Sequence, residues 1–287
     1  MPKLLKKQIA LLLLPSLLLL FFITVFPIIF SYYVSLTQFL VFEFKVSKFV
    51  GVLNYVNTLT SHRFWNSLVF TGIFSVISVS IEFILGLSLA LLFNRELRGI
   101  GILRTLMLIP MVIAPIVVSM LWKYMLHENV GIVNYVLRSI GISAPSWFST
   151  KPYALISSIL IDVWEWTPFM FLVLLAGLQS LPREPFEASL IDGASKTQIF
   201  VYITLPLMRP IIFIAVLLML MRAVTVFDIL YVTTKGGPGI YTESITYYIF
   251  NMAIKQGDVG TGCAASIITL FIVFGIFSLY LRYRPKV

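Results

Sequence analysis

Residues 187–206 read EASLIDGASKTQIFVYITLP and form the longest polar interruption between two strongly apolar runs of the chain. Small and apolar side chains recur in it at helical spacing, which predicts a short helix with one apolar side; they are Ala188, Leu190, Ile191 and Ala194. Asp192-Gly193 predicts a break, and Ser195 can cap a second helix that runs toward Ile203. An amphipathic helix resting on the membrane surface is one interpretation. We favour a docking surface, because a polar helix–turn–helix is too ordered for an ordinary connecting loop.

The composition is that of a membrane protein that crosses the bilayer several times. Of the 287 residues, 59% are hydrophobic and 11% are charged, whereas a soluble domain has about a quarter of its residues charged. Cys263 is the single cysteine, so no internal disulfide can form. His62 and His127 lie in polar connections without a second ligand at metal spacing, so we predict no metal site. We attribute the net charge of +9 to anchoring charges rather than to nucleic-acid binding.

Six apolar runs have about the 20 residues that a helix needs to cross the hydrocarbon core. They cover about 9–33, 67–93, 103–126, 154–178, 211–232 and 264–281. The first run is longer than the apolar core of a signal peptide and lacks a small-x-small cleavage site, so we expect it to remain as a span. The fold class predicted is therefore an all-α integral membrane protein, with residues 1–287 forming a single transmembrane domain.

The positive-inside rule orients these spans. Connections on one side carry 12 basic residues in short segments near the spans, namely Lys3, Lys6, Lys7, Arg95, Arg98, Arg104, Arg183, Lys196, Arg209, Arg282, Arg284 and Lys286. The other side carries 8, namely Lys45, Lys48, Arg63, Lys123, Arg138, Lys151, Lys235 and Lys255. We therefore expect both termini and the 187–206 segment to be cytoplasmic.

The polar segment also resembles a known family. Glu187-Ala188-Ser189, a three-residue gap, Gly193, a nine-residue gap and Ile203-Thr204-Leu205-Pro206 resemble the EAA loop of ABC importer permeases, with Ser189 in place of the family's second alanine. Two further clusters, residues 164–169 (WEWTPF) and 236–238 (GGP), resemble the sugar-permease branch of that family. The resemblance covers nearly the whole chain, from about residue 9 to 282.

This resemblance implies a six-helix permease of the type I importer fold in a prokaryotic plasma membrane, with both termini cytoplasmic. It implies as partners a second, similar permease, two ATP-hydrolysing subunits, an external solute-binding protein and a sugar substrate. Residues 182–206 would be the coupling loop that the ATPase grips. Its coupling residues would be Glu187, Ala188, Ser189, Asp192, Gly193, Ala194, Ile203, Leu205 and Pro206.

The chain itself lacks a phosphate-binding loop. Such a loop needs a glycine directly before its lysine and another glycine five residues earlier, after a strand. Ser195 precedes Lys196, and Ala188 stands at the earlier position. We therefore predict that ATP binds to partner subunits, that this chain needs no cofactor, and that it catalyses no reaction.

Charged and aromatic residues inside the spans are the candidates for substrate contact. Asp162, Trp164, Glu165 and Trp166 combine hydrogen-bond acceptors with aromatic faces, a mixture that suits the hydroxyls and C–H faces of a sugar. The resemblance to maltose-type permeases places sugar contacts at Asp162, Glu165 and Trp166. In the fifth span it points to Met219 and Ala223, which are apolar here where the maltose type has polar groups. Arg222 and Asp228 either bind substrate or pair with charges across the bundle, and Glu82 is interpreted as packing between helices.

Three alternatives remain beside a sugar permease. A polytopic enzyme would need a catalytic pair, for which Asp162 and Glu165 are three residues apart on one helix face. An ion-coupled secondary transporter would use the same intramembrane acids as ion sites. Both leave the docking segment unexplained. The third alternative is an ABC permease for a non-sugar solute such as glycerol phosphate.

Overall fold

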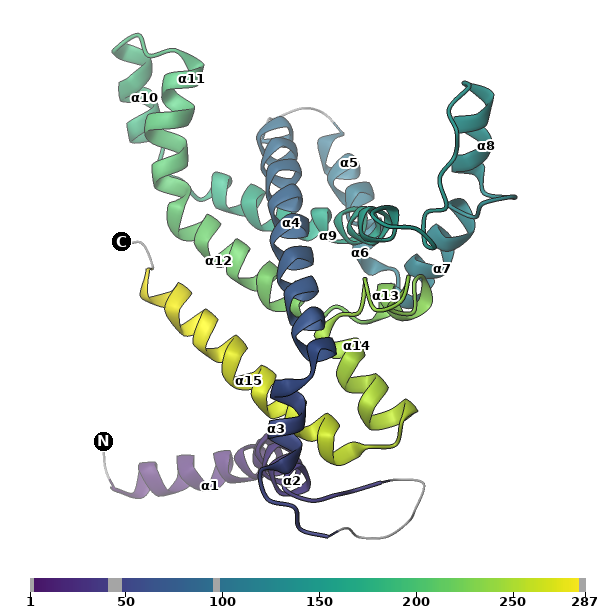
Figure 1. The fold of residues 1–287 in the computed structure, drawn as a ribbon. Coiled ribbons are helices and arrows are strands. Elements are labelled where there is room, and N and C mark those ends of the chain that lie inside the picture. The colour runs from purple at the N-terminus through teal and green to yellow at the C-terminus, as the bar shows by residue number, and fades with distance from the viewer. Residues whose placement is uncertain (1–2, 41–47, 95–98, 284–287) are drawn as a thin grey trace. The chain divides into compact units, whose positions relative to one another are not determined.

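The computed structural model describes residues 3–40, 48–94 and 99–283, and the chain divides into two compact units. One unit contains the chain up to Phe64 together with Tyr248–Phe274, and the other contains Trp65–Tyr247 together with the residues from Gly275 onward. Most of the described residues lie in helices, and none lies in a strand (Figure 1), which agrees with the all-α prediction.

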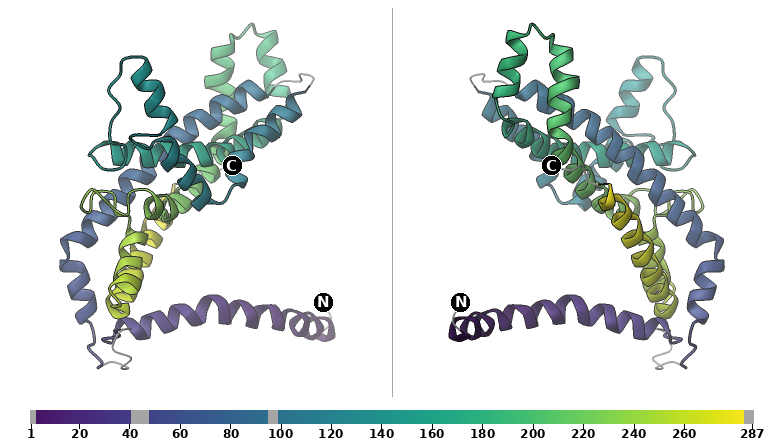
Figure 2. Two further views of the ribbon diagram at one scale, coloured as in Figure 1. Left: turned by 90° about the vertical axis from the view of Figure 1, so that its right-hand side faces the viewer. Right: turned by 90° about the vertical axis from the view of Figure 1, so that its left-hand side faces the viewer.

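The first unit contains the N-terminal helices. Here α1 (Lys3–Leu20), the π-helical turn η1 (Phe21–Val25) and α2 (Phe26–Ser35) follow one another as one rod (Figure 2). The wider π-helical turn ends two residues before Pro27, which has no N–H to donate within the helix. Asn54 of α3 (Leu53–Thr60) donates from Nδ2 to the carbonyl oxygens of Ser35 and Thr37, each at 2.9 Å. These two bonds tie the start of α3 to the end of α2.

The first unit also contains the start of α4 and residues Tyr248–Phe274. Its C-terminal part comprises the end of α14 (Ile245–Phe250), the π-helical turn η4 (Asn251–Lys255) and most of α15 (Val259–Arg282).

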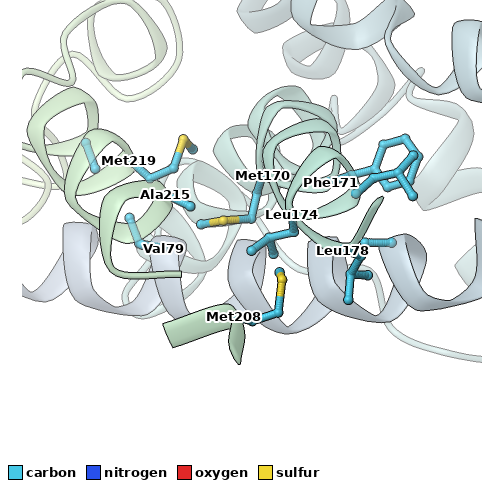
Figure 3. Close-up of a cluster of buried hydrophobic side chains, with 11 residues drawn as sticks. Val79, Met170, Phe171, Leu174, Leu178, Met208, Ala215 and Met219 are labelled. Atoms are coloured by element: carbon cyan, nitrogen blue, oxygen red, sulfur yellow. The ribbon is translucent and has the colours of Figure 1, made fainter. Parts of the chain in front are cut away.

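The core of the second unit forms where three long helices meet. These are α4 (His62–Phe93), α9 (Tyr153–Gln179) and α12 (Leu205–Val224). Figure 3 shows their apolar side chains in one cluster, which includes Val79, Met170, Phe171, Leu174, Leu178, Met208, Ala215 and Met219. Glycines permit the close approach: a Cβ at Gly86 would lie 2.7 Å from Cγ of Met170, and one at Gly177 would lie 2.6 Å from Cγ2 of Ile211. Small residues at helix contacts are typical of packing in membranes, where no water drives helices together.

The predicted third span is divided into short helices. Residues 103–126 fall in α5 (Ile100–Met107), α6 (Ile109–Val112) and α7 (Pro115–Met125). Pro110 and Pro115 each stand in the first turn of a new helix, because proline disfavours helical geometry in the residue before it and cannot donate to the preceding turn. After α7 come α8 (Ile132–Ser139) and then α9.

Five helical segments among the described residues are long and apolar enough to cross a membrane. They are Leu12–Ser35, His62–Phe93, Tyr153–Gln179, Lys196–Val232 and Val259–Arg282. Each overlaps one of the six predicted spans. The segment that does not qualify by length is the one divided at Pro110 and Pro115, so six spans and cytoplasmic termini stay predictions.

Candidate functional site

A half-buried arginine joins three helices of the second unit. Arg222 lies in the last turn of α12 and faces Asp162 of α9 and Glu82 of α4. Its Nη1 donates to Asp162 Oδ1 at 2.5 Å, and its Nη2 donates to Asp162 Oδ2 at 2.9 Å and to Glu82 Oε1 at 3.0 Å. Both acidic side chains are fully buried. The two parallel bonds to Asp162 use the planar fork of the guanidinium, so they fix α12 against α9 in orientation as well as in distance.

Charged side chains inside a span need partners of opposite charge. A single charged side chain at the centre of a span is unfavourable by about 2.5–3.5 kcal/mol on insertion scales, so each must meet an opposite charge or water. The indole ring of Trp166 adds a cation–π contact, with its centroid 4.8 Å from Cζ of Arg222. Of the two roles that the sequence left open for Arg222, the structure shows the pairing across the bundle. It also shows Glu82 as a contact between helices.

A cavity of about 110 Å³ lies beside this ion network. Its walls are formed by Pro115, Asp162, Glu165, Trp166, Arg222, Thr225, Val226, Phe227, Asp228 and Ile229. Five residues predicted to contact substrate thus line one cavity, namely Asp162, Glu165, Trp166, Arg222 and Asp228. Because typical ligand sites hold roughly 300–1,000 Å³, this cavity must widen, or be completed by another surface, before it can hold a sugar.

Two cavity residues have polar groups placed for further contacts. Glu165 is only 1% exposed, and its Oε2 atom has no hydrogen-bond partner among the described residues. Asp228 is the first residue of α13 (Asp228–Val232), where a carboxylate is favoured by the positive end of the helix dipole. An unsatisfied buried acceptor is unfavourable by about 1–3 kcal/mol, so Glu165 gains from any ligand that donates a hydrogen bond.

The other three predicted substrate residues lie elsewhere. Trp164 points away from this cavity: its ring packs edge-on against Trp122, with the centroids 5.8 Å apart, and it lines a separate apolar cavity of about 520 Å³. Met219 and Ala223 are buried in the apolar cluster between α4, α9 and α12 and do not line the 110 Å³ cavity. A role for these three in substrate contact stays a prediction.

Sequence reasoning did not select six of the residues that complete the site. Glu82 bonds to Arg222, and the cavity lining includes Pro115, Thr225, Val226, Phe227 and Ile229. Glu82 carried a signal, since an acid within an apolar run needs a partner. The other five resemble many residues in the chain, and only the packing of α7, α12 and α13 brings them together.

A second candidate site is the helical hairpin between α9 and α12. It consists of α10 (Glu184–Ile191) and α11 (Lys196–Ile199), which lie side by side in Figures 1 and 2. Gly193 has φ +74° and ends α10 in a Schellman motif: its N–H donates to Leu190 O at 3.2 Å, and the N–H of Ala194 donates to Ser189 O at 3.0 Å. The predicted break at Asp192-Gly193 is therefore present.

The second helix of the hairpin starts at the predicted cap. Ser195 Oγ accepts from the backbone N–H of Gln198 at 3.4 Å, and the backbone N–H of Ser195 donates to Gln198 Oε1 at 2.8 Å, which forms a capping box. From α11 the chain continues through the π-helical turn η3 (Phe200–Thr204) directly into α12.

The hairpin presents apolar side chains at its surface. Leu190 is 66% exposed and Ile191 is 87% exposed, and Tyr202 in the adjoining turn η3 is 75% exposed. Among the predicted coupling residues, Glu187, Ala188, Asp192 and Gly193 are exposed, Ala194, Ile203, Leu205 and Pro206 are half-buried, and Ser189 is buried. A hollow of about 540 Å³ lies against α10 and includes Glu187 and Leu190 in its lining. Exposed apolar residues that gather on one element are typical of a contact surface, so the coupling role of this hairpin stays a prediction.

Within the part of the chain that the structure describes, no group of three or more His, Cys, Asp or Glu side chains is placed to hold a metal ion.

Long apolar helices, a buried ion network and an exposed helical hairpin characterise a helical transport protein of the membrane. The chain belongs to the family of binding-protein-dependent transport system inner membrane components, whose sequence profile matches residues 82–287. It is thus a multi-pass membrane component of an ABC importer, as the resemblance in the EAA-like loop indicated.

Individual relatives extend over almost the whole chain. The trehalose/maltose transport system permease protein MalF of Thermococcus litoralis is 41% identical over 272 residues, which cover 95% of this chain and 92% of the relative. The sn-glycerol-3-phosphate transport system permease protein UgpA of Agrobacterium fabrum is 33% identical over 84% of this chain and 82% of the relative.

A solved structure shares the fold. A chain of a bacterial alginate ABC transporter, crystallised with an alginate pentasaccharide-bound periplasmic protein, matches with a TM-score of 0.82 at 22% identity. The match covers 96% of this chain and 92% of that chain. The fold is therefore that of an ABC importer permease.

Proposed function

We propose that this chain is a transmembrane subunit of an ATP-binding-cassette importer that carries a sugar into the cell. The observation that carries the proposal is the 41% identity to a trehalose/maltose permease over nearly the full length of both chains. The cavity beside Arg222 supports it, because acidic acceptors and the ring of Trp166 suit the hydroxyls and C–H faces of a sugar.

In this proposal the chain works with several partners. A second permease completes the pathway, two ATP-binding subunits supply energy, and an external solute-binding protein delivers the sugar. The chain crosses the membrane six times with both ends in the cytoplasm. The α10–α11 hairpin contacts an ATP-binding subunit through its exposed face, which includes Glu187, Leu190 and Ile191.

The chain catalyses no reaction on the sugar. Its own residues bind and orient the solute transiently at the cavity, and closure of the ATP-binding subunits moves the hairpin. Because α10 and α11 are joined closely to α9 and α12, this movement changes access to the cavity from the two sides of the membrane.

Transport by the reconstituted complex tests the proposal. The chain is co-expressed with its partner subunits, the complex is placed in liposomes loaded with ATP, and uptake of labelled trehalose and maltose is measured with the binding protein outside. We expect uptake of at least one neutral sugar that requires ATP. Uptake of glycerol phosphate but of no sugar, or sugar uptake that follows an ion gradient without ATP, would overturn it.

A further inference from the structure

The cavity beside Arg222 presents more acidic than basic side chains to a solute. Arg222 is the single cationic side chain among its described lining residues, whereas Asp162, Glu165 and Asp228 are acidic. Both Nη atoms of Arg222 already bond to carboxylates, and its flat face contacts Trp166. An anionic group that enters the cavity therefore meets a cation already held by two acids, together with the carboxyl groups of Glu165 and Asp228.

A neutral hydroxyl meets different conditions. Glu165 Oε2 is a buried acceptor without a partner, and Nε of Arg222 is a buried donor without a partner among the described residues. A sugar carries several hydroxyl groups, each of which can donate to an acceptor such as the first or accept from a donor such as the second. Either bond satisfies a buried polar atom without bringing charge into a medium in which like charges repel strongly.

We propose that this cavity selects uncharged, hydroxyl-bearing sugars and rejects acidic saccharides and phosphorylated solutes, with Glu165 as the residue that determines this specificity. The inference rests on the proposed function, in which a sugar passes this cavity. Family membership alone does not predict the charge of the solute. One relative is named for glycerol 3-phosphate, an anion, and another for trehalose and maltose, which are neutral.

The test measures binding to the membrane complex itself, so that the selectivity of the external binding protein does not interfere. The complete transporter is purified with its partner subunits and without the binding protein. Its melting temperature is followed as glucose, maltose or trehalose is added, and again with the analogue of each in which one C6 hydroxymethyl group is a carboxylate. A ligand of the folded state at free concentration L stabilises it by RT ln(1 + L/Kd), so the dependence of the melting temperature on ligand concentration gives an apparent Kd for each series.

For the wild-type complex we expect at least one neutral sugar to bind about tenfold more tightly than its acidic analogue, or better, which corresponds to about 1.4 kcal/mol. Glu165→Gln keeps the shape of the side chain and removes its charge, so the preference should fall severalfold, mainly through tighter binding of the acid. Asp228→Asn makes the same test at a second position if the first variant does not assemble. Glu128→Gln is the control, because Glu128 is an exposed acid that does not line the cavity.

The outcomes separate the two claims. Equal affinity of the wild-type complex for the neutral and acidic sugars, or an unchanged preference in both Glu165→Gln and Asp228→Asn, would overturn the charge selectivity while sugar binding stands. Stabilisation by none of the neutral sugars would refute the substrate site itself, and the selectivity with it.

Discussion

Gly193→Val should disconnect the hairpin from transport without disturbing the rest of the chain. Gly193 adopts φ +74°, and a Cβ built there would have no other atom within 4 Å. The substitution therefore introduces no collision, and its whole effect is the strain of a left-handed backbone. That strain is about 1–2 kcal/mol for a residue with a Cβ, and a β-branched residue is especially disfavoured. Since 1–2 kcal/mol changes a population by about 5–30-fold, we expect uptake to fall by about that factor.

The chain provides a closely matched control. Gly141 ends α8 with φ +80°, again with nothing within 4 Å of a Cβ. It makes the same pair of cap bonds: Gly141 N–H donates to Arg138 O at 3.1 Å, and Ile142 N–H donates to Leu137 O at 2.9 Å. Gly141→Val thus introduces equal strain at a different helix. Gly193→Asn is the second control, because asparagine tolerates the left-handed conformation.

The assay compares these three variants in the complete transporter. Membrane content of the chain, retention of the ATP-binding subunits, uptake, and stimulation of ATP hydrolysis by the loaded binding protein are measured in parallel. We expect Gly193→Val to reach the membrane but to lose uptake and stimulation, whereas Gly193→Asn and Gly141→Val keep most of both. If Gly193→Val performs like Gly141→Val, the hairpin does not couple the ATP-binding subunits to the transport pathway.

Three further predictions concern the ion network, topology and energy supply. Asp162→Asn leaves the charge of Arg222 only partly compensated and should destabilise the complex by about 3–5 kcal/mol. Arg222→Lys keeps a charge but loses the two-bond fork, so it should have a smaller effect. Equal melting temperatures for the two variants would contradict this order. Reporter fusions after Thr204 should report the cytoplasm and fusions near Ser149 the exterior, and a reversed pattern would contradict the orientation. The chain purified alone should show no change in melting temperature with ATP, because it lacks a phosphate-binding loop; a nucleotide-dependent rise would refute that.

The sequence predicted the helices and caps better than it predicted their contacts. The turn at Gly193 and the cap at Ser195 follow from local chemistry, so they could be read directly. Residues 103–126 show that the average hydropathy of an apolar run does not predict whether the run forms one continuous helix. The hydropathy of this run is that of a span, yet Pro110 and Pro115 divide it into short helices.

Contacts between distant segments depend on how each helix is rotated. Arg222 bonds to residues 60 and 140 positions away, and nothing local indicates which acids these are. Met219 and Ala223 illustrate the same limit, since successive residues of a helix are about 100° apart around its axis. Ala223 follows Arg222 directly, yet it is buried in the apolar cluster while Arg222 lines the cavity. An error of one position in the helix register, about 100° of rotation, therefore exchanges a cavity residue for a core residue.

The hairpin connects the two helices that the ion pair holds together. It follows α9, which carries Asp162, and it continues without a break into α12, which carries Arg222 about 40 Å beyond Lys196 at 1.5 Å per residue. Because the two-bond pair tolerates little sliding, we expect a movement of the hairpin to carry α9 and α12 as one rigid body.

Another part of the cavity wall comes from other elements, namely Pro115 of α7 and Asp228 of α13. A rigid movement of α9 and α12 against this wall would widen the cavity and leave the ion pair intact. Spin labels on α9 and α12 should then keep a constant separation through the ATP cycle, while labels on α9 and α13 move apart. A change between α9 and α12 that is as large as that between α9 and α13 would show that the ion pair opens instead, with Arg222 released to act on the solute directly.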